Sequence, residues 1–398
     1  MDILKKVLFC AVLSGVVGGE ILRFDNGQSV AITFLDIAVI LFVGVTFFIN
    51  LFQQKPLVIT KVCKFAMWFV GIGIVGLLFF IPKLSYYQTI VAILYAIRFI
   101  LYTVGVFLSV QLLTTNFKKQ IPYFLSGVST LLSGIGIAQY LWYPELRNLY
   151  YAGWDPHLYR VFATFLDPNF IGLFYVCGVI LGIYLYFHKL KTQNSKHKII
   201  FGFTTLLNLL ALFLTYSRGA YLALLAALCI MLWRGGYKKL ILLVFGGLVM
   251  IIAGIEFLSP HSEGTKLFRT ASIRDRAVSL QQVTTIIMHH PFLGVGFDAY
   301  RYAQQKEGFL PTNPQTTHSG AGTDNSFLFV FATTGIVGLI VYLLMTWEVI
   351  KVSYSSKSLS GHVLFASYIA LIFGSFFVNA LFYPFLLVWI WVMIGVMV

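Results

Sequence analysis

The sequence has few charged residues, and this scarcity excludes an ordinary soluble protein. Only 11% of the 398 residues are charged, whereas 59% are hydrophobic, and the mean hydropathy is +0.86. Soluble domains are nearer one quarter charged and about half apolar. We therefore predict a polytopic membrane protein in which residues 1–398 form a single membrane domain. Its net charge of +14 is divided among short clusters between apolar runs, which indicates membrane topology and no nucleic-acid partner.

The chain also lacks the patterns that mark metal and nucleotide sites. Its four cysteines lie in or beside apolar runs, so neither a disulfide framework nor a paired-cysteine zinc site is indicated. The acidic residues are scattered singly, whereas a metal-bridged diphosphate site ordinarily shows clustered carboxylates. No glycine-rich nucleotide loop is present, and the Gly-x-Gly at 294–296 follows no strand. We expect no metal and no cofactor. Any activity would draw its energy from the substrate or from a gradient.

Long apolar runs are what the sequence has in abundance. A spanning helix needs about 20 apolar residues, and twelve runs approach or reach that length, so we predict an all-α protein with about twelve transmembrane helices. The runs are 7–22, 32–51, 65–81, 88–115, 121–142, 169–187, 199–215, 220–233, 240–258, 326–347, 363–379 and 384–398.

The distribution of lysine and arginine predicts which loops face outward. With a cytoplasmic N-terminus, the inner loops carry sixteen cations and the short outer loops only five, the bias expected of a membrane protein. Two larger loops then lie outside, 143–168 and 259–325, the second preceding the last three helices. The aromatic residues of 143–168 fit either interfacial anchors or platforms that stack on sugar rings.

Four arginines are candidates for binding an anion. Arg218 lies at a membrane edge, where a charge marks either a functional site or an arginine that extends to lipid headgroups. Arg274, Arg276 and Arg301 lie in the 259–325 loop and fit a solvated salt-bridging patch. Together with Arg218 they would instead form a cationic pocket suited to phosphate oxygens.

Two residues are candidates for a general base. His318 and Asp324 flank the glycine-rich turn 319–322, and either side chain can accept a proton. A lone loop histidine is often incidental. Asp324, directly before Asn325 and an apolar helix, also has the sequence of a plain N-terminal cap.

Four patterns, in this order, resemble the bacterial O-antigen ligase and O-antigen polymerase superfamily, which includes the Wzy-type polysaccharide polymerases. They cover about 165–345. They are Phe165-Leu166-Asp167-Pro168-Asn169 with Gly172; Ser217-Arg218-Gly219-Ala220; Ser272-x-Arg274 followed by His290-Pro291-Phe292-Leu293-Gly294-Val295-Gly296-Phe297; and Asp324-Asn325-Ser326-Phe327-Leu328 with Thr334-Gly335-Ile336-Val337-Gly338.

The resemblance implies a type C membrane glycosyltransferase of the bacterial plasma membrane. Its members transfer a glycan from undecaprenyl diphosphate to an acceptor sugar hydroxyl on the extracytoplasmic face, with inversion and without a metal. Arg218 and Arg274 match the arginines that hold the diphosphate. The partners implied are the lipid-linked donor, an acceptor glycan, the bilayer and a chain-length regulator.

The departure from the family pattern at Asp324 favours one activity within it. Ligases usually have histidine there, so aspartate favours a polymerase of lipid-linked repeat units, making O-antigen, capsule or exopolysaccharide. His318 would substitute as the base if the turn folds back. The alternatives are a ligase that attaches finished glycan to lipid A core, protein or wall, and a secondary transporter. A transporter should place charges at the membrane midplane, where Arg98 is the clear instance.

Overall fold

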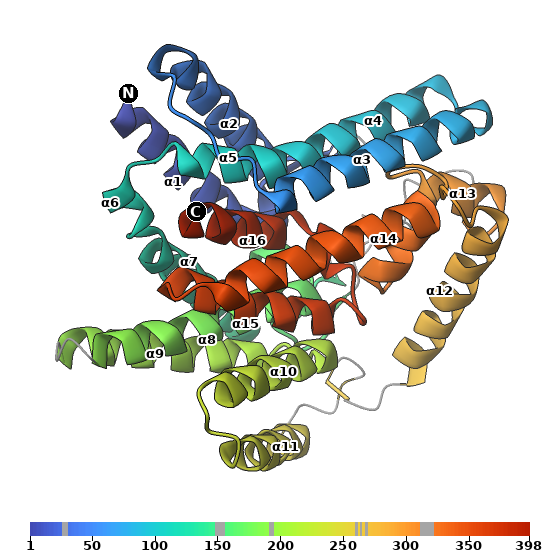
Figure 1. The fold of residues 1–398 in the computed structure, drawn as a ribbon. Coiled ribbons are helices and arrows are strands. Elements are labelled where there is room, and N and C mark those ends of the chain that lie inside the picture. Colours follow the sequence, from blue (N-terminus) through green and yellow to red (C-terminus); the bar gives the residue numbers. More distant parts are fainter. Residues whose placement is uncertain are drawn as a thin grey trace.

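A computed structural model describes residues 1–25, 31–147, 156–190, 195–258, 262, 265–266, 270–310 and 322–398. These residues are almost entirely helical, as predicted (Figure 1). The exception is a short antiparallel pair in which β1 (Arg23–Asp25) lies beside β2 (Ala31–Thr33).

The helices follow the predicted apolar runs closely. The first half contains α1 (Asp2–Gly18), α2 (Phe34–Gln53), α3 (Lys61–Phe80), α4 (Tyr86–Ile100), α5 (Val106–Gln111), α6 (Thr115–Lys118) and α7 (Ile121–Trp142). A π-helical turn, Leu101–Gly105, joins α4 to α5. The second half contains α8 (Pro168–Leu190), α9 (Ser195–Phe213), α10 (Arg218–Arg234), α11 (Leu240–Leu258), α12 (Thr270–His289), α13 (Tyr300–Lys306), α14 (Ser326–Ser355), α15 (Leu359–Gly374) and α16 (Pro384–Met397).

Each of the twelve predicted runs contains a helix, but fewer are long enough to span a membrane. Seven helical segments in the described part of the chain have the necessary length and apolarity. They are Phe34–Gln53, Lys61–Lys83, Tyr86–Gln111, Thr115–Trp142, Pro168–His188, Lys196–Phe213 and Ser326–Ser355. This result supports an integral, multi-pass membrane protein, and twelve spans remain a prediction.

The core surrounds the last helix, α16. This helix packs against α5 and α15, and α14 packs against α3 and α15 (Figure 1). Nearly every side chain from Phe385 to Ile394 is buried, as expected of a helix that is apolar on all faces.

The long 259–325 loop predicted from the sequence is partly helical. It contains α12, which lies at the edge of the molecule, and the short α13 near the ends of α3 and α14 (Figure 1). Between them, the segment 291–297 inserts between α3 and α14, and this insertion explains the Gly-x-Gly at 294–296.

The insertion depends on a break in α14. Gly335 has φ 64° and ψ −169°, which interrupts the helical hydrogen bonding. The N–H of Ile336 would bond to the carbonyl of Ala332 in an unbroken helix, but it donates to Pro291 O at 2.9 Å. The freed Ala332 carbonyl accepts from Val295 N–H at 3.0 Å. Segment 291–297 and α14 therefore exchange backbone hydrogen bonds. The N–H of Ile336 and the carbonyl of Ala332, which the break separates, both keep a hydrogen-bond partner.

Glycine is required on the other side of the insertion as well. Gly296 has φ 96°, and a Cβ there would lie 2.4 Å from the Cα of Leu77 on α3. The next residue, Phe297, donates its N–H to Gly73 O at 3.0 Å. The segment is thus fixed between two helices.

Helix ends predicted to lie on one side of the membrane contact one another. Ser262 Oγ of one predicted outer loop lies 3.5 Å from Leu158 O of the other. The ring of Tyr383, before α16, stacks on Phe170 at the start of α8, with 3.9 Å between centroids. These contacts join segments that the sequence places outside the membrane, and the layout of the loops itself stays a prediction.

Candidate active site

The sequence pattern at 165–169 contacts the pattern at 217–220 at the start of α10. Ser217 is the residue before α10, but its hydroxyl donates to Asn169 Oδ1 at 3.0 Å and does not cap the helix. Asn169 is itself fixed at the start of α8, where its N–H donates to Asp167 Oδ1 at 2.6 Å. Gly172 lets the two helices approach, because a Cβ there would lie 3.0 Å from Ala220 Cβ. These contacts fix the beginning of α10.

A buried arginine that the sequence did not single out supports the same turn. Arg160 is only 5% exposed, and its Nε donates to Thr215 O at 2.8 Å. A second guanidinium nitrogen lies 3.5 Å from Asn169 Oδ1. Between Thr215 and the helix, Tyr216 has φ 50°, a rare conformation for a residue other than glycine. Such backbone strain is frequent at functional sites.

Arg218 and Arg276 come together although they are far apart in the sequence. Arg218 is the first residue of α10 and is half-buried. Burial lowers the pKa of its guanidinium, and the charge of Arg276 on α12 lowers it further. The guanidinium of Arg276 lies 5.8 Å from the ring centroid of Phe377, whose Cβ is 3.0 Å from the position of a Cβ on Gly219. Two neighbouring cations, both still charged, make a site that favours an anion.

Asp324 lies near Arg276, and it is not the helix cap. The cap of α14 is Asn325, whose Oδ1 accepts from the N–H groups of Phe327 at 2.8 Å and Leu328 at 3.1 Å. The suggestion that Asp324 caps the helix was therefore wrong by one residue. The reason is that the extended backbone of Asn325 aims its own side chain at the first turn. Asp324 has an exposed side chain and remains available for chemistry.

The electrostatic surroundings of Asp324 suit a base. Solvent reaches the side chain, yet the surrounding protein desolvates the carboxylate and raises its pKa, and Asp275 acts in the same direction. Arg276 opposes this effect. A carboxylate with a raised pKa is a better proton acceptor at neutral pH than an ordinary aspartate.

The other candidates lie elsewhere. Arg274 is exposed on α12, and residues two apart on a helix do not share a face, so it does not point the same way as Arg276. Arg301, on α13, lies beside Asp298 instead. Burial raises the pKa of Asp298 to about 7, against the opposing charges of Arg98 and Arg301. His318 lies outside the described residues.

Arg98, the charge inside an apolar run, forms a closed ion pair. Its Nε lies 2.7 Å from Asp36 Oδ1 and its second nitrogen 3.0 Å from Asp36 Oδ2. Tyr102 donates to the same carboxylate at 2.8 Å. Asp36 is in the first turn of α2 and completes a capping box with Thr33. Arg98 thus joins α4 to the beginning of α2, which is a structural role.

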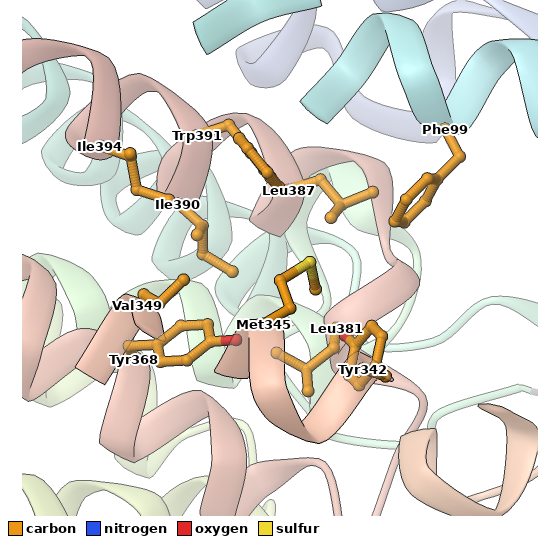
Figure 2. Close-up of a pocket in the computed structure, with 10 residues that line it drawn as sticks. All are labelled: Phe99, Tyr342, Met345, Val349, Tyr368, Leu381, Leu387, Ile390, Trp391 and Ile394. Carbon is orange, nitrogen blue, oxygen red and sulfur yellow. The ribbon is translucent and has the colours of Figure 1, made fainter. Parts of the chain in front are cut away.

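A separate pocket lies between α4, α14, α15 and α16 (Figure 2). All ten residues that line it are uncharged, so it offers nothing to a phosphate group. They are Phe99, Tyr342, Met345, Val349, Tyr368, Leu381, Leu387, Ile390, Trp391 and Ile394.

Comparison with known proteins supports the resemblance seen in the sequence. Residues 203–343 match the O-antigen ligase family. This part includes Arg218, Arg276 and Asp324 and the break at Gly335. No curated protein matches the chain.

Proposed function

Starting from the similarity of residues 203–343 to the O-antigen ligase family, we propose that this chain polymerises lipid-linked oligosaccharide repeat units into a cell-surface polysaccharide. It would transfer a glycan from undecaprenyl diphosphate to an acceptor sugar hydroxyl, on the extracytoplasmic face of the bacterial plasma membrane. One observation carries the proposal most strongly: Arg218 and Arg276 lie within electrostatic range of each other, and Arg276 also acts on Asp324.

The arginines suit the leaving group. A diphosphate departs with the electron pair of the glycosidic C–O bond, and stabilising its charge lowers the barrier most effectively. Guanidinium groups bind phosphate oxygens through paired hydrogen bonds. The first N–H groups of α10, which have no side-chain cap, would add to this site, because a helix N-terminus favours anions. Arg274, exposed on α12, would contact the donor from further out.

Asp324 suits the acceptor. The acceptor oxygen attacks the anomeric carbon from the side opposite the diphosphate, which inverts the configuration, and the hydroxyl proton passes to the carboxylate of Asp324. Its raised pKa makes this transfer more favourable. His318 is the second candidate for the base.

The test uses purified protein in liposomes with undecaprenyl-diphosphate oligosaccharide from its own host. A gel ladder spaced by one repeat unit is expected from the wild type. Arg218→Ala or Arg276→Ala should reduce the rate by about 100-fold, the size of effect seen when a charge-stabilising donor is removed. The matched control is Arg147→Ala, because the side chain of Arg147 is 66% exposed and, among the described residues, pairs with Glu145 at 3.0 Å. A ladder that survives both substitutions at Arg218 and Arg276 would refute the proposal.

The second candidate is a ligase, which the description of the matched family favours. It would use the same donor site but transfer finished glycan to lipid A core, protein or wall. A preparation that makes no ladder from donor alone, yet transfers glycan once such an acceptor is added, would identify this activity.

A further inference from the structure

Two polar atoms near Asp324 are buried without a hydrogen-bond partner in the described part of the chain. One is the hydroxyl of Tyr300, the first residue of α13, and the other is Oδ1 of Asn379, in the turn between α15 and α16. Tyr300 is only 1% exposed. An unsatisfied buried polar group destabilises the folded state, so native proteins seldom keep one without a use.

Both residues surround the turn that carries Asp324. The Nδ2 atom of Asn379 lies 3.0 Å from the position that a Cβ would take on Gly322. The ring of Phe329 lies 3.7 Å from that same position, and the ring of Tyr300 packs against Phe329 with 6.0 Å between centroids. The carboxylate of Asp324 is close enough to contribute to the raised pKa of the Tyr300 hydroxyl, which burial chiefly causes. One small region therefore contains a donor, an acceptor and a candidate base.

The chemistry of these groups selects a class of ligand. A carboxylate and an amide oxygen repel anionic oxygens, so this region does not suit a phosphate. A hydroxyl both donates and accepts, and it can therefore satisfy the hydroxyl of Tyr300 and the amide oxygen of Asn379 alike. A pyranose ring presents several neighbouring hydroxyls, which would pair with all three side chains.

We propose that Tyr300 and Asn379 form a subsite for the acceptor sugar, in which they bind hydroxyls next to the one that Asp324 deprotonates. This inference rests on the proposed function. The donor diphosphate lies on the Arg218 side, so Tyr300 determines acceptor specificity and leaves donor binding unchanged. Acceptors with a free hydroxyl beside the reacting one are preferred.

The experiment measures transfer from the lipid-linked donor to a soluble acceptor oligosaccharide at varied concentration, together with thermal unfolding. Tyr300→Phe should lower kcat/KM for the acceptor about tenfold, for example through a higher acceptor KM. This is the size of effect expected when one hydrogen bond to a ligand is lost. The donor KM should not change. The unfolding temperature should stay level or rise, since the substitution removes an unsatisfied hydroxyl. An acceptor lacking the neighbouring hydroxyl should react as slowly with the wild type as with the variant.

Tyr175→Phe is the matched control. Tyr175 is also fully buried, but its hydroxyl donates to Leu132 O at 2.9 Å, so its removal should lower the unfolding temperature and leave the acceptor KM unchanged. If Tyr300→Phe behaves like this control, or leaves acceptor kinetics unchanged while Arg218→Ala abolishes transfer, the subsite is wrong and the proposed function stands. If Arg218→Ala and Arg276→Ala leave transfer unchanged, the proposed function fails and the subsite fails with it.

Discussion

The insertion of segment 291–297 between α3 and α14 predicts a large effect of Gly296→Ala. Gly296 has φ 96°, a conformation that costs an L-residue roughly 1–2 kcal/mol. The new Cβ would lie 2.4 Å from Leu77 Cα, a backbone atom that no rotamer change can move. Overpacking of this kind costs about 1–3 kcal/mol. We therefore expect a loss of about 2–5 kcal/mol in the free energy of unfolding.

Alanine substitutions at two other glycines distinguish the cost of the backbone conformation from the cost of the steric clash. Gly308 has φ 74° with nothing within 4 Å of its Cβ position, so Gly308→Ala incurs only the conformational cost. Gly71, in the middle of α3, has open space as well, and Gly71→Ala should be neutral or stabilising. The assay is thermal unfolding of the detergent-purified protein, followed by tryptophan fluorescence. Equal unfolding temperatures for Gly296→Ala and Gly308→Ala would show that the segment is not clamped against α3.

Two further predictions concern charged groups. Because desolvation raises the pKa of Asp324, the base stays protonated up to a higher pH than an ordinary aspartate. Transfer should therefore fall as the pH drops through that raised pKa. Asp324→Asn should strongly reduce transfer, and the residual activity should lack this acid limb of the pH profile; an acid limb that persists in the variant assigns the base to another residue. Asp36→Asn leaves Arg98 partly buried with a weakened partner and should cost about 3–5 kcal/mol, whereas Glu145→Gln in an exposed pair should cost about 0–1 kcal/mol. Equal unfolding temperatures for these two variants would contradict a structural role for the Arg98 pair.

The sequence predicted the helices well because their signal is local. Each apolar run contains a helix, since hydrophobic length and composition alone determine that outcome in a membrane. The ends were less certain: Asp324 and Asn325 are both good capping residues, and only the backbone direction at Asn325 decides between them. The face of α12 was also uncertain from the sequence: the resemblance assigned the diphosphate to Arg218 and Arg274, whereas in the structure Arg274 is exposed and Arg276 is half-buried.

The residues that sequence reasoning missed are single polar side chains that act through distant contacts. Arg160 binds Thr215, 55 residues away, and Tyr300 on α13 and Asn379 in the turn before α16 each lie near the turn that carries Asp324. No spacing pattern connects such residues. The one local signal was glycine, since Gly294, Gly296 and Gly335 all have positive φ where two chain segments exchange hydrogen bonds.

The two charged clusters differ in a way that bears on their roles. Arg98 and Asp36 form a close ion pair, and Tyr102 donates a hydrogen bond to the same carboxylate, so the charges offset each other within the protein. Arg218 differs in its surroundings: it stands at the positive end of the α10 dipole, where a cation is unfavourable, and the charge of Arg276 lowers the pKa of its guanidinium further. An anion bound between the two arginines would offset both penalties. A sequence keeps such local conflicts where function requires them, and the proposed diphosphate would carry the charge that offsets both.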